Sequence, residues 1–271
     1  MMATRASSRW SPTPLLKASA ALHVGAAALA LARPSLWPWA LGAVILNHAQ
    51  LTATGLWPRS SLLGPNLTRL PAAAAQRREI ALSIDDGPDP EVTPQVLDLL
   101  DQFGVKATFF CVGKRVEDYA ELAREIVRRG HAIENHSYRH LNYFSLLGPR
   151  ALANEIERAQ EAIGTITGRR PLFFRAPAGL RSPLLDPVLT RLGLLLASWT
   201  RRGFDSVNGD PESVLVRLTS GLAAGDILLL HDGHAARTRT GSPVILEVLP
   251  RLLTGIAHSG LIPVRLNAAL A

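Results

Sequence analysis

Cysteine is almost absent from this chain, since Cys111 is the single one among 271 residues. One cysteine excludes an internal disulfide, and its place in the apolar run TFFCVG is typical of a small core residue. The chain also has no internal repeat and no low-complexity tract beyond an alanine-rich stretch at 72–75, which excludes repeat architectures. Hydrophobic residues make up 47% and charged residues 19%, so the chain can bury a sizeable core.

Acidic residues are in the minority: the formal net charge is +7, and arginine supplies nearly all of the excess. The arginines are scattered, and no stripe of alternating basic and aromatic residues accompanies them. We therefore expect no nucleic-acid partner. A position at a membrane surface or an acidic substrate accounts for the positive charge at least as well.

Two apolar runs, at 18–32 and 35–57, indicate that the N-terminal part of the chain is associated with a membrane. Tryptophans lie near both ends of the second run, as in the interfacial belt of a spanning helix. The first run is short for a bilayer that requires ~20 residues, and its alanines contribute little hydrophobicity. The triplet Ala30, Leu31 and Ala32 also suits the cleavage site of a signal peptide.

Three topologies remain open: a two-helix hairpin, a cleaved signal peptide followed by one anchor, and one anchor alone. The distribution of basic residues favours a hairpin with both ends in the cytoplasm. These residues are Arg5, Arg9, Lys17, Arg33, Arg59, Arg69, Arg77 and Arg78. We expect a membrane segment of one or two helices at 1–58, a linker at 59–77 and a catalytic domain at 78–271, attached to a bacterial-type inner membrane. The side of the membrane and the oligomeric state stay open.

From residue 79 onward, strand patterns alternate with helical patterns. Seven strands are predicted, in the runs EIALSIDD, VKATFFCVG, HAIENHS, LFFRAPAG, LGLLLASWT, DILLLHDG and LIPVRLN. Helices are expected between them, near 92–100, 116–130, 150–166, 183–192, 211–223 and 244–257. This alternation predicts an α/β fold with a parallel sheet covered by helices, which either a doubly wound sheet or a (β/α) barrel satisfies.

Polar residues suited to catalysis or metal binding follow the ends of these predicted strands. In (β/α) barrels, catalytic residues gather at the carboxyl ends of the strands. We therefore expect these side chains, which are far apart in the sequence, to meet on one rim of the sheet. They are Asp85, Asp86, His136, Arg175, Asp205 and His231.

Two short motifs carry a metal-ligating pattern. SIDDGP places Asp85 and Asp86 side by side against their mutual repulsion, as expected if they share a cation or divide the roles of ligand and base. HSYRH places His136 and His140 four residues apart, a spacing that taken alone is more often structural than metal-binding. Together, one aspartate and two histidines form an N,N,O set that suits zinc or another divalent transition metal.

The motifs SIDDGP, HSYRH, RAPAG and LLH, in this order, resemble those of the polysaccharide deacetylases, which share the NodB-homology domain of carbohydrate esterase family four. The resemblance covers residues 78–267. It implies a distorted (β/α) barrel with about seven parallel strands and one divalent metal, usually zinc. It also implies removal of N-acetyl, and sometimes O-acetyl, groups from glycans.

The resemblance implies a role for each candidate residue by its motif. Asp85 would be the catalytic base, and Arg175 would orient it and favour its charged form. His231 would be the general acid, with Asp205 in support. These roles are the ones that amide hydrolysis needs, because water must lose a proton and the leaving amine must gain one. The metal ligands would be Asp86, His136 and His140.

Departures from the family pattern bear on the substrate more than on catalysis. Ala178 stands where many members carry an aromatic residue, and Ser206 stands where the family has tryptophan. We expect Trp199 or Phe204 to form the wall of the sugar site that this tryptophan forms in the family. His234, in HDGH, is assigned to a solvated loop.

Each candidate also has a structural explanation when it is taken singly. The two aspartates could cap a turn, Arg175 could be an ion-pair partner, and His231 could be a hydrogen-bonded core histidine. Asp205 could stabilise a turn, and Ser83, where the family often has threonine, is a mild change in strand packing. None of these explanations accounts for the whole set.

The sequence predicts a metal-dependent hydrolase that removes N-acetyl groups from an N-acetylglucosamine-type polysaccharide, oligosaccharide or lipid-linked sugar. Zinc is the expected metal, and an N-acetylated glycan or glycolipid is the expected partner. The alternative is a catalytically inactive, membrane-tethered carbohydrate-binding module. Loss of a ligand, base or acid would favour that alternative, and none is lost here.

Overall fold

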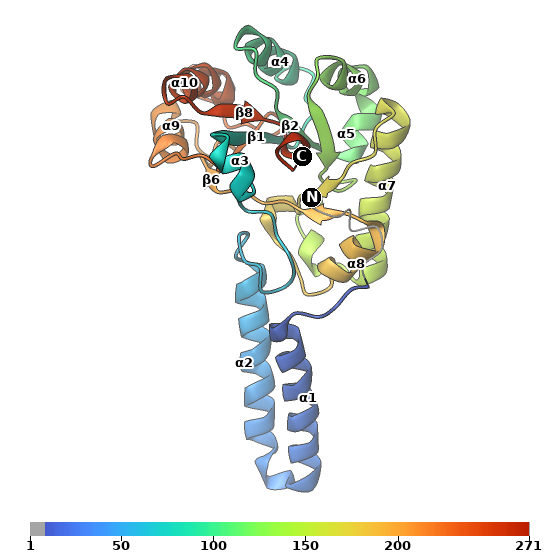
Figure 1. The fold of residues 1–271 in the computed structure, drawn as a ribbon. Coiled ribbons are helices and arrows are strands. Elements are labelled where there is room, and N and C mark those ends of the chain that lie inside the picture. Colours follow the sequence, from blue (N-terminus) through green and yellow to red (C-terminus); the bar gives the residue numbers. More distant parts are fainter. Residues whose placement is uncertain (1–8, 271) are drawn as a thin grey trace.

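The computed structural model describes residues 9–270 and has a parallel sheet at its centre (Figure 1). The strand order is β5-β4-β3-β2-β1-β7-β6, and β8 pairs with the start of β1. All pairs of these strands are parallel. The strands are β1 (Glu79–Asp85), β2 (Thr108–Cys111), β3 (Ala132–Asn135), β4 (Phe173–Phe174), β5 (Leu195–Leu196), β6 (Arg201–Arg202), β7 (Ile227–His231) and β8 (Ile262–Val264).

Strand β1 lies in the middle of the sheet, and its apolar side chains are buried on both faces, as in other parallel sheets. On one side it pairs with β7 from Ala81 to Asp85. On the other side it pairs first with β8 and then, from Ser83 onward, with β2. This register sets Asp85 opposite His231, so two of the predicted site residues are neighbours across the sheet.

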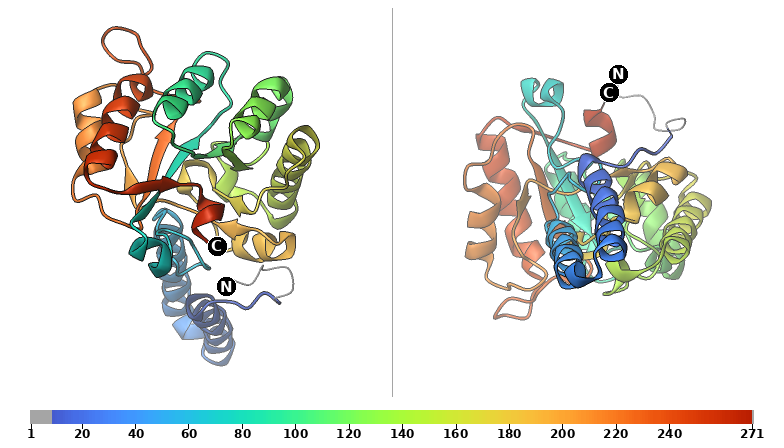
Figure 2. Two further views of the ribbon diagram at one scale, coloured as in Figure 1. Left: turned by 45° about the horizontal axis from the view of Figure 1, so that its top comes forward. Right: turned by 90° about the horizontal axis from the view of Figure 1, so that it is seen from below.

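Helices cover the outer face of the sheet, as the two views in Figure 2 show. They are α4 (Thr93–Gln102), α6 (Ala120–Arg128), α7 (Pro149–Thr167), α8 (Leu185–Leu192), α9 (Pro211–Thr219) and α10 (Val244–His258), with the short α5 (Gly113–Asp118) before α6. Apolar residues of α4, α6 and α10 form the main core against the sheet. The inner face is covered by two short helices, α3 (Ala72–Gln76) and α11 (Leu266–Ala269), which pack over Phe110 and Leu229.

The predicted (β/α) barrel with about seven parallel strands is confirmed. Each of the seven predicted runs contains a strand, and β6 is an eighth. In the described part of the chain the edge strands β5 and β6 do not pair with each other, so the barrel is open. We predicted one strand in the run 192–200. Instead, β5 ends at Leu196, and residues 197–200 carry the chain from one edge of the sheet to the other, where β6 begins.

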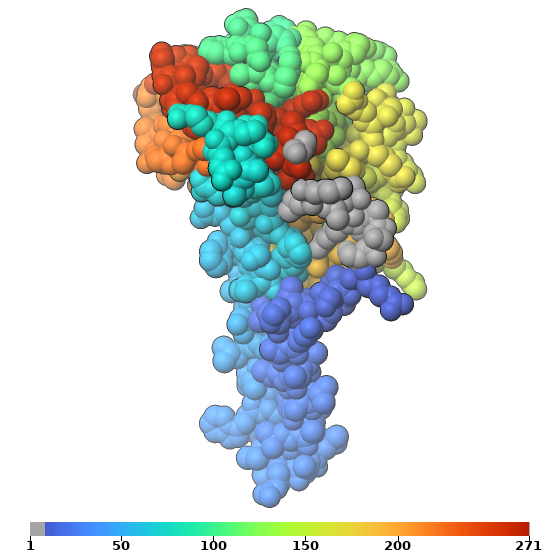
Figure 3. All heavy atoms as spheres, in the orientation of Figure 1, coloured from blue at the N-terminus to red at the C-terminus, as the bar shows by residue number. Residues whose placement is uncertain are grey.

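Two long helices, α1 (Pro14–Ala32) and α2 (Trp37–Gly55), form a hairpin that projects from the α/β domain (Figures 1 and 3). The short 3-10 helix η1 (Pro34–Leu36) joins them at the far end. The two helices lie side by side, and Asn47 Nδ2 donates a 2.8 Å hydrogen bond to Ser19 Oγ between them. Trp37 and Trp39 at the turn of the hairpin are exposed.

Within residues 9–270, α1 is the one helix that is long and apolar enough, by length and composition, to cross a membrane. This reverses the order expected from the sequence, in which the first run was the weaker candidate. Helix α1 begins at Pro14, before the predicted apolar run, whereas α2 carries the polar residues Asn47, His48 and Gln50. Arg5, one of the basic residues used for the topology, lies outside the described residues.

The segment from 56 to 77, most of which we expect to be a linker, packs on the α/β domain. Leu63 and Leu70 are buried, and Leu67 forms a β-bridge with Ala197. The end of α2 is attached as well, because the Arg181 N–H donates to the carbonyl oxygen of Gly55 at 3.2 Å. The hairpin therefore leaves the domain through an ordered junction.

Candidate active site

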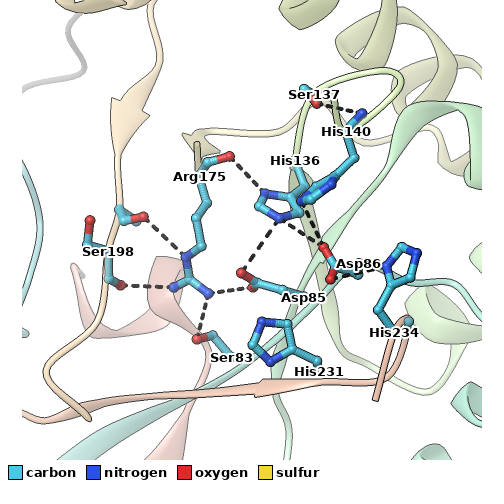
Figure 4. A network of polar contacts seen from close by, with 12 residues as sticks. Ser83, Asp85, Asp86, His136, Ser137, His140, Arg175, Ser198, His231 and His234 are labelled. Atoms are coloured by element: carbon cyan, nitrogen blue, oxygen red, sulfur yellow. Dashed lines mark hydrogen bonds and ion pairs between the residues drawn. The ribbon is translucent and has the colours of Figure 1, made fainter. Parts of the chain in front are cut away.

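The carboxyl ends of the strands surround a cavity of about 240 Å³. Residues from five places in the sequence line it, and they include most of the site residues predicted above. Figure 4 shows their side chains pointing toward one another. Those that line the cavity are Asp85, Asp86, His136, His140 and His231, together with Ala178, Trp199 and Arg202. Arg175 and Asp205 lie behind them, fully buried.

Asp86, His136 and His140 bring one ligand atom each to within 4.8 Å of the others. The Nε2 atoms of both histidines lie 3.2 Å from Asp86 Oδ1. Even so, Asp86 Oδ1 and His140 Nε2 are buried without a hydrogen bond of good geometry. Buried polar atoms left unpaired are costly, so this convergence fits a cation between the three side chains.

The electrostatics of the three residues also suit a cation. Burial would raise the pKa of Asp86, but hydrogen bonds from His136 and His234, together with the charges of His136 and His140, hold it well below its usual range. Burial, with a smaller contribution from His136, lowers the pKa of His140 to about 4. An ionised carboxylate beside a neutral imidazole is the protonation state that metal binding requires.

The backbone around these ligands is held in a rare conformation. Asp86, Ser137 and His140 have φ angles of 74°, 62° and 52°, in the left-handed region that non-glycine residues seldom adopt. His136 Nδ1 lies 2.8 Å from the carbonyl oxygen of Arg175, which leaves Nε2 facing Asp86. The His140 N–H donates to Ser137 Oγ at 3.1 Å. Such strain persists only where the surrounding structure fixes it, and it is common at functional sites.

Arg175 supports Asp85 from the interior of the sheet. Its Nη1 donates to Asp85 Oδ1 at 2.5 Å and to Ser83 Oγ at 2.9 Å. Its remaining donors bond to the carbonyl oxygens of Ala197 and Ser198 at 3.2 and 2.9 Å. Burial lowers the pKa of Arg175, and the negative charge and hydrogen bond of Asp85 partly offset this decrease. With four hydrogen bonds, the Arg175 guanidinium fixes the position of the Asp85 carboxylate.

His231 and Asp205 form a second buried pair beside Asp85. His231 Nδ1 lies 2.9 Å from Asp205 Oδ1, and the backbone N–H of His231 donates to Asp205 Oδ2 at 2.7 Å. Burial alone would lower the pKa of His231, but Asp205, and to a smaller extent Asp85 and Asp86, raise it to about 9. This histidine is therefore a cation near neutral pH and can give up a proton.

Three polar residues of the site were missed or assigned elsewhere from the sequence. The Ser83 hydroxyl accepts from Arg175 and donates to the Leu228 carbonyl at 2.7 Å, so it is more than a packing residue. His234, assigned to a solvated loop, has its Nδ1 3.4 Å from Asp86 Oδ2, although its side chain is 62% exposed. Asp232 is buried below the loop, and burial raises its pKa to about 7. The motif HDGH contained a signal for the last two, since Gly233 allows a close approach to the backbone of Asp86.

The wall expected to hold the sugar is made by Trp199 rather than by Phe204. Trp199 lines the cavity next to Ala178, whose φ of 54° is also in the left-handed region. Phe204 lies outside this cavity, in the neighbouring cleft. The Gly179 N–H is already bonded to the Ala176 carbonyl at 2.8 Å. The backbone N–H of Ala178 is therefore the donor that could bind a substrate oxygen at this end of the cavity.

Known proteins of similar sequence and fold show which family the chain belongs to. A family model described as polysaccharide deacetylase matches residues 72–197. A peptidoglycan-N-acetylglucosamine deacetylase of Bacillus cereus is 37% identical over 175 residues, which cover 64% of this chain and 81% of that protein. The chain belongs to the polysaccharide deacetylase family. It is thereby a member of a family of hydrolases that act on amide bonds.

Other members of the polysaccharide deacetylase family show the same relationship. A chitooligosaccharide deacetylase of Azorhizobium caulinodans is 34% identical and matches 57% of this chain and 73% of its own length. The crystal structure of the Bc1960 peptidoglycan N-acetylglucosamine deacetylase superimposes with a TM-score of 0.68 at 25% identity, over 75% of this chain and 92% of that one. The family model stops at residue 197. The family model therefore does not reach Asp205 and His231, whose expected contact is observed in the structure.

Proposed function

We propose that this protein is a metal-dependent hydrolase that removes N-acetyl groups from an N-acetylated glycan. The observation that carries the proposal is the meeting of two supported groups in one cavity. Asp85, held by Arg175, is suited to accept a proton, and His231, held by Asp205, is suited to donate one. Both lie beside the metal-ligating set of Asp86 and the two histidines.

One divalent ion, which we assign as zinc, would be held by Asp86, His136 and His140. The fit is supported by the convergence of the three ligand atoms, of which Asp86 Oδ1 and His140 Nε2 are buried without a hydrogen bond. When bound, such an ion polarises the acetyl carbonyl group and lowers the pKa of a water molecule. A set of two imidazoles and one carboxylate leaves coordination positions open for water and substrate, as in catalytic zinc sites.

The residues around this set supply the proton transfers of amide hydrolysis. Asp85 takes the proton of the attacking water, while the new C–O bond forms at the acetyl carbonyl carbon. The Ala178 N–H is available to the carbonyl oxygen as its negative charge develops. His231 then gives its proton to the sugar nitrogen as the C–N bond breaks. The products are acetate and a free amine on the glycan.

The substrate class follows from the cavity and from the relatives. N-acetylglucosamine-type polysaccharide, oligosaccharide and lipid-linked sugar all carry the acetamido group that this chemistry needs. Trp199 in the cavity wall offers a flat apolar face for a sugar ring. Relatives named peptidoglycan and chitooligosaccharide deacetylases support this range.

We also propose that the hairpin of α1 and α2 attaches the enzyme to the membrane. Each helix has 19 residues, which corresponds to about 28 Å, close to the thickness of the hydrocarbon core. Exposed tryptophans lie at both ends, with Trp37 and Trp39 at the turn and Trp10 and Trp57 next to the domain. The polar pair Ser19 and Asn47 is buried between the helices, where each satisfies the other.

Acetate release from N-acetylated chitooligosaccharide by the full chain tests the function. We expect release that stops with a chelator and with Asp85→Asn, and that persists in the exposed control Asp118→Asn. Full activity of metal-free protein, or of Asp85→Asn, would contradict the mechanism. Binding of the oligosaccharide without any acetate release would instead support the carbohydrate-binding module.

A further inference from the structure

A second, more open cleft of about 580 Å³ lies next to the catalytic cavity. The two share Ala178, Trp199 and Arg202 as lining residues, so they adjoin along one wall. One side of the cleft comes from the end of the hairpin, with Trp57 and Arg59. Apart from the shared Ala178 and Trp199, the proposed deacetylation chemistry does not use this cleft.

Three arginines of the cleft carry charge that the protein does not neutralise. Arg59, Arg202 and Arg217 line it, and within residues 9–270 none of them forms an ion pair with a carboxylate. Arg59 donates to one carbonyl oxygen, that of Thr200, at 3.2 Å. By contrast, Arg201 in the same cleft is fully engaged with Asp226 and with backbone carbonyls.

Aromatic rings hold two of these guanidinium groups in place. The Arg202 guanidinium carbon lies 4.6 Å from the centre of the Phe204 ring and 5.4 Å from that of Trp199. The guanidinium carbon of Arg217 lies 5.4 Å from the centre of the same Phe204 ring. The Nε of Arg202 is buried and has no hydrogen-bond partner. Stacked, positioned arginines with unused donors are typical of a site that binds an anion.

The chemistry of the cleft does not match a neutral glycan. Like charges brought together repel one another, and a neutral N-acetylated sugar would not offset that cost. A phosphate does, because its oxygens accept the paired N–H groups of a guanidinium. The position of the cleft adds a second indication. It lies at the end of α2, which under the proposed attachment is the membrane surface, where the phosphate of a lipid would be.

We propose that this cleft binds the phosphate or diphosphate of a lipid-linked substrate, whose N-acetylated sugar extends into the adjoining catalytic cavity. The proposal rests on the proposed function and narrows its substrate class to a sugar joined through phosphate to a membrane lipid. Arg202, which lines both cavities, lies where the sugar meets the phosphate. Arg59 and Arg217 are the outer contacts of the phosphate.

The first experiment compares two substrates with the full chain in lipid nanodiscs. One is N-acetylglucosamine joined through diphosphate to a polyprenyl chain, and the other is neutral N-acetylchitotetraose. We expect Arg217→Gln and Arg59→Gln each to lower kcat/KM for the lipid-linked substrate about tenfold relative to the neutral one. A merely structural defect would lower both values alike, so the ratio separates binding from folding. Arg150→Gln, an exposed arginine on α7, is the matched control and should leave the ratio unchanged.

The second experiment measures binding without turnover. Asp85→Asn protein is titrated with the polyprenyl diphosphate itself, with inorganic diphosphate and with vesicles of phosphatidylglycerol, and tryptophan fluorescence is followed. We expect the polyprenyl diphosphate to bind most tightly, with about tenfold weaker binding after Arg217→Gln. Equal binding of the vesicles would show a general headgroup contact and overturn the proposal. If inorganic diphosphate binds as tightly as polyprenyl diphosphate, the lipid does not contribute to binding, and the proposal of a lipid-linked substrate is overturned.

The outcomes also separate this proposal from the proposed function. Acetate release from chitotetraose with an unchanged substrate ratio in both arginine variants overturns the lipid-phosphate cleft and leaves the deacetylase intact. No acetate from either substrate overturns the deacetylase, and the fluorescence titration still decides whether the cleft binds lipid diphosphate.

Discussion

His231 and Asp205 are joined twice, through the ring Nδ1 and through the backbone N–H of the histidine. The ring contact keeps a proton on Nδ1 and leaves Nε2 as the atom that exchanges a proton with substrate. The backbone contact holds the Asp205 carboxylate in place in both protonation states of the His231 ring. His231, the proposed general acid, is therefore both oriented and kept charged by one residue that is completely buried.

The first prediction concerns the alkaline limit of activity. Because Asp205 raises the pKa of His231 to about 9, wild-type activity should persist to about that pH and fall above it. Asp205→Asn removes the charge while burial still lowers the pKa, so the alkaline limb should move down by roughly 2 pH units. The profile of kcat/KM against pH measures this shift. An unchanged alkaline limb would show that His231 is not the acid.

The same pair makes a prediction about stability. The pKa of His231 is raised from 6.5 in the unfolded chain to about 9 in the folded one. The stabilisation from this pair is therefore complete below about pH 6.5 and is lost as the pH rises through about 9. In Asp205→Asn, the free energy of unfolding should decrease less as the pH rises from 6 to 10 than it does in the wild type. Denaturant unfolding of both proteins between pH 6 and 10 is the measurement.

Metal binding should stabilise the fold directly, because the ligands converge only in the folded state. Added Zn²⁺ should raise the Tm of the wild type, and His140→Ala should reduce the shift strongly. His258→Ala, at the exposed end of α10, is the matched control and should retain the full shift. An equal shift in His140→Ala would place the bound ion elsewhere. Differential scanning calorimetry in detergent reads this out without any substrate.

Ser83 should behave as a positioning residue for Arg175. Ser83→Ala removes a hydroxyl that bonds both the Arg175 guanidinium and the Leu228 carbonyl, and we expect a loss of about 1–3 kcal/mol in the free energy of unfolding. Activity should fall as well, mainly in kcat, because Asp85 loses its fixed partner. Ser83→Thr keeps the hydroxyl and should restore both values. Equal stability and activity in Ser83→Ala and wild type would contradict this role.

The junction of the hairpin is tested by two glycines of α2. A Cβ added at Gly55 would collide with the carbonyl oxygen of Arg181, whereas one added at Gly42 meets no atom. Gly55→Ala should therefore lower stability by about 1–3 kcal/mol, and Gly42→Ala should not lower it. Thermal unfolding of the full chain in detergent compares them. A neutral Gly55→Ala would mean that the end of α2 is free of the domain.

The charge pattern of the hairpin predicts its orientation. Arg9 and Lys17 precede or begin α1, and Arg59 follows α2, whereas Arg33 stands alone at the turn. We expect both ends of the hairpin in the cytoplasm, so a fluorescent protein fused at the C-terminus should fluoresce and an alkaline phosphatase fused there should be inactive. An active phosphatase fusion would reverse the orientation and give the enzyme access to the mature cell wall.

Much of the site was predictable because its residues lie in short motifs at strand ends. Asp85 and Asp86 follow an apolar strand, and the spacing of His136 and His140 points to one ligand set. Ser83 could not be found this way, since a serine inside a buried strand gives no sign that an arginine 92 residues further on will bond to it. Its role depends on the position of β4 relative to β1, which only the folded sheet defines.

The part between the hairpin and β1 has a feature that its composition does not indicate. Residues 59–77 contain proline, glycine and a run of alanines, which is the composition of a linker. In the fold, the alanines form α3, which covers the inner face of the sheet because small side chains fit closely over Ala81 and Phe110. Local composition could not reveal that a helix of five residues covers the inner face of the open barrel.

The contacts of Gly55, Pro58 and Ser60 with Arg181 and Ser198 lock the hairpin to the rim of the catalytic cavity. In a bilayer, such a coupling would hold the mouth of the cavity at a constant height above the lipid. The enzyme could not reach outward along a long polymer. It would meet its substrates by lateral diffusion, as a two-dimensional search among molecules that share its own membrane leaflet.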